Sequence, residues 1–281
     1  MPLARIVCVS FLACSAFLLA GALAHQPTEP APVLKSDFVP QSAGASLLSP
    51  SGPSPLDDAI AALAPERTRW LELTVSQKGK QDGAAFEAEI YCIVGPDDRL
   101  RWDMRVQVGK TVSRQRIVSN GRLLWLGRRV ANAFPRGELL ILPTETGVPD
   151  RAQRLEARHK LLAEKGFVTL QTLLTNVRQQ MQNPQRQAGT WKGKLVELVT
   201  GGWHGTGSVP SIWSTAGEAR RCNVYFDQAT RMPFRLEWWT EAGPNRPSTL
   251  LWEMEIRNLV INRPLAPEAF AHTFCFATLY N

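Results

Sequence analysis

Side chains that commonly do chemistry are few in this sequence and lie far apart. No two of the four histidines share a short spacing that would place them on one metal ion; they are His25, His159, His204 and His272. No serine stands in a Gly-x-Ser-x-Gly turn, and the glycine-rich residues 205–208 are not followed by the lysine of a phosphate-binding loop. The sequence therefore predicts no catalytic residue, no metal ion and no cofactor.

Carboxylates recur at every second position in two stretches, Glu87 with Glu89 and Glu253 with Glu255. Alternate residues of a strand point to the same face, so each pair should lie on a solvated face of a sheet. There they can form cross-strand ion pairs with arginines, and the candidate partners are Arg101, Arg105 and Arg235. This placement favours a surface role over acid–base catalysis.

The chain is basic, with 32 Lys and Arg against 25 Asp and Glu and a formal net charge of +7 at pH 7. The cationic residues are dispersed among the acidic ones and form no stripe, so the sequence lacks the usual signature of nucleic-acid binding. Contact with an anionic membrane surface remains open, because a positive balance favours it.

The first 24 residues are typical of an export signal peptide. Arg5 supplies a positive start, residues 6–24 are largely apolar, and the Ala-Leu-Ala that ends at Ala24 fits the pattern that signal peptidase cleaves. We therefore expect cleavage after Ala24 and a periplasmic or otherwise exported protein. Two alternatives stay open, which are lipidation at Cys14 and an uncleaved membrane anchor formed by residues 6–24.

Three cysteines remain beyond the signal peptide, and they are Cys92, Cys222 and Cys275. Their spacing matches no zinc site. A Cys222–Cys275 disulfide and buried, unpaired thiols are both compatible with the sequence.

Composition divides the rest of the chain into a tether and a domain. Residues 25–54 are rich in Pro, Ser and Ala and show no apolar periodicity, which predicts a flexible tether. A domain spanning residues 55–281 follows. It opens with a short helix over residues 56–63, which Ser54 can cap and Pro55 can start.

Beyond the short helix, apolar residues recur at every second position, as expected of half-buried antiparallel strands. A meander of five strands is predicted, over residues 70–76, 86–94, 100–108, 112–119 and the run after Asn120-Gly121, a dipeptide that favours a type I′ hairpin. Two helices are expected next, over residues 150–165 and 169–182. Further strands are expected over residues 194–200, 220–227, 234–241, 250–257 and 273–276.

These elements predict an α+β domain, built as a single curved antiparallel sheet of about ten strands. Such a half-barrel would have two or three helices covering its concave face. That face either encloses a cavity or forms a filled core, and its aromatic and methionine side chains suit an irregular apolar guest. The candidate cavity-lining residues are Trp102, Met104, Trp125, Leu173, Val177, Phe226, Phe234, Trp238, Trp252 and Met254.

Four segments carry a resemblance to a known family. They are RWDM at residues 101–104, VSNGRLLW at 118–125, YFDQATRMPFRLEW at 225–238 and NRPLAPEAF at 262–270. Together with the export signal, they resemble the LolA-like superfamily of periplasmic lipoprotein carriers over residues 56–276. The resemblance implies an unclosed β-barrel with helices as a lid, which holds acyl chains or another apolar ligand and catalyses no reaction.

The chain departs from the small carriers of that family in its Pro-rich tether, a long loop at residues 201–217 and the Trp238-Trp239 pair. A divergent member is therefore expected, and two functions stay open. The first is an exported carrier for an apolar small molecule or an acylated protein. The second is an envelope interaction or sensor module with a filled core and a protein partner. Free volume beneath the helix at residues 169–182 would separate the two.

Overall fold

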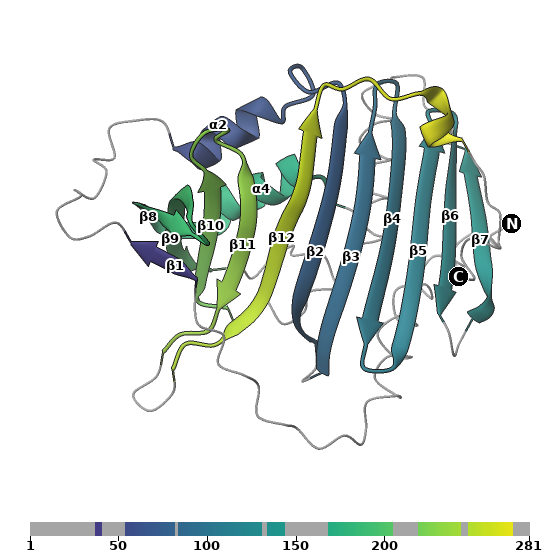
Figure 1. The fold of residues 1–281 in the computed structure, drawn as a ribbon. Coiled ribbons are helices and arrows are strands. Elements are labelled where there is room, and N and C mark those ends of the chain that lie inside the picture. The colour runs from purple at the N-terminus through teal and green to yellow at the C-terminus, as the bar shows by residue number, and fades with distance from the viewer. Residues whose placement is uncertain are drawn as a thin grey trace, which may run out of the picture.

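A computed structural model of the chain describes residues 37–40, 54–81, 84–130, 134–143, 168–204, 219–242 and 247–271. Within them, twelve strands form one open antiparallel sheet in the order β1-β8-β9-β10-β11-β12-β2-β3-β4-β5-β6-β7 (Figure 1). The strands are β1 (Phe38–Pro40), β2 (Leu71–Gln81), β3 (Ala84–Val94), β4 (Arg99–Val108), β5 (Thr111–Asn120), β6 (Leu123–Val130), β7 (Phe134–Pro143), β8 (Met181–Trp191), β9 (Lys194–Trp203), β10 (Arg221–Asp227), β11 (Pro233–Trp239) and β12 (Leu250–Ile261).

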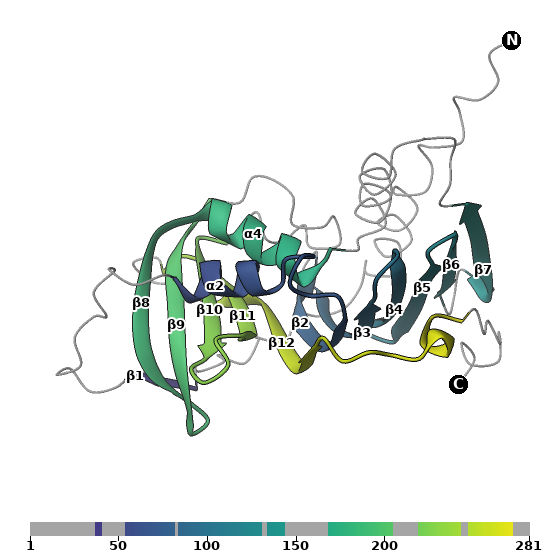
Figure 2. The ribbon, with the colours of Figure 1, turned by 90° about the horizontal axis from the view of Figure 1, so that it is seen from above.

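The predicted α+β class is wrong, because the described part of the chain is mostly β-strand. In the described part of the chain only two α-helices occur, α2 (Pro55–Ala62) and α4 (Leu170–Gln180), together with the short 3₁₀ helix η2 (Pro267–Phe270). The two α-helices cover the sheet at its β8–β12 end and do not extend over β4–β7 (Figure 2). We call the face of the sheet against α2 and α4 the inner face, and the opposite face the outer face.

The predicted meander is present and continues by one strand, from β2 to β7. Its side chains alternate between the two faces, most regularly in β4. Leu100, Trp102 and Met104 are buried in the inner core, whereas Arg101 and Asp103 between them are half-buried on the outer face. The period-two pattern thus decides which side chains meet the core and which meet solvent.

The turn after β5 forms at Asn120-Gly121, but not with the two left-handed residues of a type I′ turn. Gly121 has a φ of 92°, whereas Asn120 is not among the residues with positive φ. The Asn120 side chain instead accepts hydrogen bonds from the backbone N–H groups of Arg122 and Leu123, both at 2.9 Å. A Cβ at Gly121 would also collide with the carbonyl oxygen of Asp97, so this turn needs glycine for space as well as for φ.

The last strand, β12, joins the two halves of the sheet by pairing with β11 on one side and β2 on the other. Asn262 follows β12, and its side chain binds the backbone just before β2. Its Oδ1 accepts a hydrogen bond from the Arg69 backbone N–H at 2.8 Å, and its Nδ2 donates to the Arg67 carbonyl at 2.7 Å. The C-terminal strand is therefore held where the first long strand begins.

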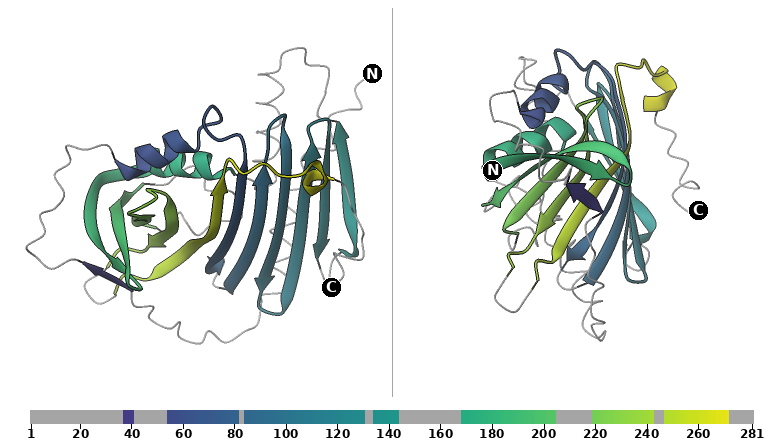
Figure 3. Two further views of the ribbon diagram at one scale, coloured as in Figure 1. Left: turned by 45° about the horizontal axis from the view of Figure 1, so that its top comes forward. Right: turned by 60° about the vertical axis from the view of Figure 1, so that its left-hand side comes forward.

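Both helices begin at the residues that their sequences indicate. Ser54 caps α2 by accepting from the Leu56 N–H at 3.3 Å, and Thr169 caps α4 by accepting from the Thr172 N–H at 3.1 Å. The sheet curves around the two helices (Figure 3). The described helices include none with the length and apolar character needed to cross a membrane.

Besides β7, two further strands lie where none was expected. The predicted helix at residues 169–182 ends at Gln180, and β8 starts at once with Met181, its ladder broken by a bulge between Gln182 and Gln185. β1 lies inside the expected tether, where Phe38 contacts the Tyr225 ring at a centroid distance of 5.9 Å. The expected helix at 150–165, the strand at 273–276 and most of the loop at 201–217 lie outside the described residues.

Candidate functional site

Three tryptophans meet on the inner face near α4, and we call Trp203, Trp238 and Trp252 the tryptophan cluster. Trp238 and Trp252 are direct partners across β11 and β12, and their rings stack at a centroid distance of 4.2 Å. The Trp203 ring stands edge-on to the Trp238 ring at 5.9 Å. All three side chains are buried, so the cluster forms a wide aromatic surface inside the protein.

The tryptophan cluster contains buried polar groups that lack a partner. The indole Nε1 atoms of Trp203 and Trp238 have no hydrogen-bond acceptor. A buried tryptophan N–H usually finds an acceptor, and leaving such a donor unsatisfied costs about 1–3 kcal/mol. Each of these N–H groups can therefore donate a hydrogen bond to an oxygen atom of a bound molecule.

Eight of the ten residues predicted to line a cavity lie on this inner face. Seven are buried in one core, and they are Trp102, Met104, Val177, Phe226, Trp238, Trp252 and Met254; Leu173 packs against the same core from α4 and is partly buried. Trp203 was missed because Gly201-Gly202 interrupts the apolar alternation just before it, which favoured a loop over the end of β9.

The other two predicted residues, Trp125 and Phe234, belong to the outer face. Trp125 pairs with Val118 across β5 and β6, on the face opposite the inner-core residues Leu124 and Leu126. Phe234 packs against a separate outer cluster formed by Trp191, Val196, Leu198 and Tyr225. Both strands carry apolar side chains on their two faces, so alternation alone does not show which face is the core.

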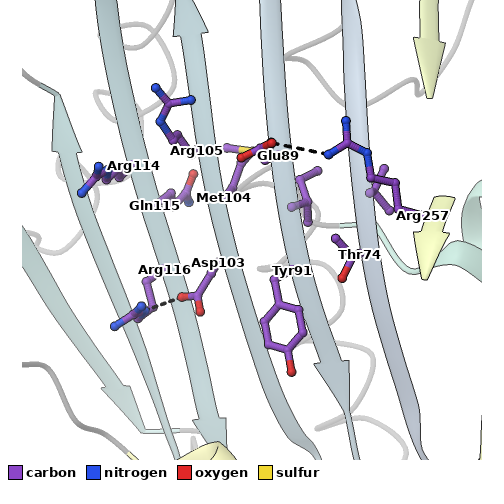
Figure 4. A pocket seen from close by; sticks show the side chains of 12 residues that line it. Thr74, Glu89, Tyr91, Asp103, Met104, Arg105, Arg114, Gln115, Arg116 and Arg257 are labelled. Carbon is purple, nitrogen blue, oxygen red and sulfur yellow. Dashed lines mark hydrogen bonds and ion pairs between the residues drawn. The ribbon is translucent and has the colours of Figure 1, made fainter. Parts of the chain in front are cut away.

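The outer face carries a hollow of about 430 Å³ (Figure 4). The sequence predicted only a solvated strand face at these positions. The lining of the hollow combines four arginines with two carboxylates. The residues are Thr74, Val75, Glu89, Ile90, Tyr91, Asp103, Met104, Arg105, Arg114, Gln115, Arg116 and Arg257. We call this feature the arginine hollow.

Both carboxylates of the arginine hollow face arginines. Asp103 binds Arg101 at 2.8 Å and also contacts Arg116, whereas Glu89 lies 3.6 Å from Arg257 (Figure 4). This second pair is exposed and loose. Arg235, the third candidate cross-strand partner, does pair with Glu253, as expected.

Tyr91 in the same hollow is held in its neutral form. Burial raises the pKa of Tyr91, and the Glu72 carboxylate, which accepts a hydrogen bond from its hydroxyl at 3.3 Å, raises it further. Within the described ranges, no three His, Cys, Asp or Glu side chains gather closely enough to hold a metal ion. The hollow therefore offers positive charge and hydrogen-bond donors for binding.

A buried carboxylate, Glu237, lies on the outer face of β11 with only 1% of the residue exposed. It accepts hydrogen bonds from the Tyr225 hydroxyl and the Trp239 indole N–H, both at 2.9 Å, and from the Arg235 guanidinium at 2.7 Å. Arg235 also lies over the Trp191 ring at 4.6 Å. Because its partners satisfy the charge of Glu237 completely, this cluster is structural.

Cys92 and Cys222 are free and buried in the structure. Burial raises the pKa of the Cys92 thiol from 9.0 to about 12, and burial followed by the Glu237 charge raises the pKa of Cys222 well above 9.0. Because the thiolate is the reactive form, we expect neither thiol to react with an aromatic disulfide reagent in native protein at about pH 8. Both should react once guanidinium chloride unfolds the chain, with peptide mapping to locate the label.

The same shift links Cys92 to the pH dependence of stability. The unfolded chain loses this proton near pH 9.0, whereas the native protein keeps it until about pH 12, so the Cys92 contribution to the free energy of unfolding falls between these values. Fast labelling of Cys92 in native protein would contradict the burial described above.

No protein-family profile and no curated protein matches this chain. Among solved structures, a DUF1329 family protein from Desulfovibrio piger aligns with 78% of this chain and 96% of its own, at 7% identity and a TM-score of 0.28. A putative outer membrane lipoprotein-sorting protein domain from Vibrio parahaemolyticus aligns with 76% of this chain and 97% of its own, at 8% identity and a TM-score of 0.29. Neither likeness assigns this chain a family or a function.

Proposed function

We propose that this chain is a non-enzymatic binding protein that carries an apolar ligand, a lipid or the acyl chain of a lipoprotein, in the cell envelope. The observation that carries the proposal is the pair of buried indole N–H groups of Trp203 and Trp238, which have no acceptor. An ester or carboxyl oxygen of a bound acyl compound would supply one. The envelope location is supported by the export signal expected in residues 1–24.

The surroundings of the tryptophan cluster suit the rest of such a ligand. Met104 and Met254 belong to the same core, and methionine adapts its shape to an irregular apolar guest. Each CH₂ group removed from water contributes about 0.8 kcal/mol, so a long chain needs few polar contacts to bind tightly. In this proposal α4 covers the site through Leu173 and Val177, and its Arg178 pairs with Asp57 of α2 at 3.0 Å, on the exposed side.

The test uses a fluorescent fatty acid and two matched substitutions, Trp238→Phe and Trp191→Phe. Trp238→Phe keeps an aromatic ring in the cluster and removes one N–H donor, so we expect the Kd for the probe to rise roughly tenfold. Trp191 lies in the separate outer cluster, and Trp191→Phe should leave the Kd unchanged. Fluorescence titration of the three folded proteins measures the effect.

Native mass spectrometry of protein purified from its own envelope fraction gives an independent test. A co-purified lipid or acylated peptide supports the carrier and identifies its ligand. A folded wild-type protein that carries no ligand and binds no probe contradicts the proposal and favours the interaction or sensor module.

A further inference from the structure

We propose that the arginine hollow on the outer face binds a phosphate group. Its lining brings Arg105, Arg114, Arg116 and Arg257 together from β4, β5 and β12, against the two carboxylates Glu89 and Asp103. Guanidinium groups recognise phosphate through paired N–H donors, and a volume of about 430 Å³ accommodates a phosphate ester. This site is separate from the inner face, so the inference does not depend on the proposed carrier function.

The arrangement of charge in the hollow supports this ligand. Arg105 on β4 is the direct cross-strand partner of Arg114 on β5, and Arg114 is in turn the partner of Arg129 on β6. Like charges directly opposite one another destabilise a sheet. The cross-strand pair of Arg105 and Arg114, both of which line the hollow, therefore favours binding of an anion.

The two carboxylates leave room for such an anion. Asp103 is already neutralised twice, by Arg101 from its own strand and by Arg116 from β5. The Glu89 side chain is 62% exposed and only 3.6 Å from the half-exposed Arg257, a loose pair that a phosphate can replace. Arg257 then adds a donor from β12 to those of β4 and β5.

Two substitutions in the hollow test the assignment against two outside it. In the double variant Arg105→Gln/Arg114→Gln, we expect at least a tenfold rise in the Kd for glycerol phosphate, measured by calorimetry on the full folded domain. The control Arg67→Gln/Arg69→Gln removes the same charge from exposed positions between α2 and β2 and should bind as the wild type does.

A second arm of the experiment separates two sources of the phosphate group. Co-sedimentation compares vesicles of phosphatidylglycerol with vesicles of phosphatidylcholine alone. Binding to glycerol phosphate but not to vesicles supports a soluble phosphate ester, and binding to phosphatidylglycerol vesicles that the hollow variant loses supports a lipid headgroup.

Two results of the main experiment would overturn the inference. One is a wild-type protein that binds neither glycerol phosphate nor anionic vesicles, and the other is an equal loss in the control variant. If the double variant does not fold, Arg257→Gln replaces it, since this side chain is about half exposed and its removal spares the strand pairs. Unchanged binding by Arg257→Gln and by every other folded hollow variant also contradicts the assignment.

Discussion

Replacing Glu237 by glutamine is expected to lower the free energy of unfolding by about 3 kcal/mol. The carboxylate is almost fully buried, and its Oε2 accepts from both Tyr225 and Trp239 while its Oε1 accepts from Arg235. A glutamine amide has only one acceptor oxygen. Its NH₂ group would face N–H or O–H donors and cannot accept a hydrogen bond from them. The substitution also removes a negative charge beside a buried guanidinium, which is the costlier change.

Arg235 shows how tightly the buried charges depend on one another. Burial alone lowers the pKa of Arg235, but the carboxylates of Glu237 and then Glu253 more than offset it, so the pKa is raised. Without the Glu237 charge, Glu253 alone must stabilise the guanidinium. We therefore expect the loss of the Glu237 charge to alter the packing of Trp191 as well, because the Trp191 ring lies against Arg235.

Urea unfolding followed by tryptophan fluorescence measures the change, with Glu241→Gln as the matched control. Glu241 is exposed just beyond β11, so the same chemical substitution should change stability by no more than about 0.5 kcal/mol. Equal midpoints for the two variants would show that the Glu237 cluster contributes nothing to stability.

Replacing Trp238 by alanine is expected to lower the free energy of unfolding by about 3–5 kcal/mol. This side chain is the largest among the fully buried ones, and it lies between Trp203 and Trp252 with ring contacts to each. Truncation removes both contacts and leaves a cavity at the centre of the tryptophan cluster. The cost includes the lost apolar burial and the incomplete collapse of the surroundings.

The matched control for Trp238→Ala is the variant Leu195→Ala, because Leu195 is 54% exposed at the start of β9. Urea unfolding is measured for both variants. Truncation of Leu195 should shift stability by less than about 0.5 kcal/mol. If both variants unfold at the same urea concentration, the tryptophan cluster is not the well-packed centre of the inner core.

Regular alternation allowed much of the sheet to be predicted from the sequence. β3 and β4 show it clearly, since Ile90, Cys92, Trp102 and Met104 belong to the core while Tyr91 and Asp103 between them do not. The capping residue Ser54 likewise marked the start of α2. These features depend on side chains that are close together in the chain, so they can be predicted from the sequence.

β8 shows where such reasoning fails. Gln182 and residues 185–187 carry polar side chains, so no apolar period marks a strand, and β8 forms by pairing with β9 on both sides of its bulge. β1 pairs with the other edge of β8, and Phe38 contacts Tyr225, which lies almost 190 positions away in the chain. Pairing with neighbouring strands, and not the local sequence pattern, therefore determines that β8 and β1 form.

The arginine hollow was missed for a related reason. Each arginine by itself is typical of a solvated strand face, and only the register of β4 and β5 places Arg105 directly opposite Arg114. The class prediction failed because helices were expected to cover a whole face, whereas α2 and α4 lie over one end of a twelve-stranded sheet.

The position of β12 sets the order in which this protein can fold. Strands β2 to β7 can pair one hairpin at a time as they are synthesised, because each neighbour in the sheet is also the neighbour in sequence. β12 reaches β2 only at the end, and the Asn262 side chain then bonds to Arg69, 193 residues earlier. Until that moment the edge of β2 presents unpaired backbone groups to which another chain can add, so the interval before β12 arrives is when this protein is most open to aggregation.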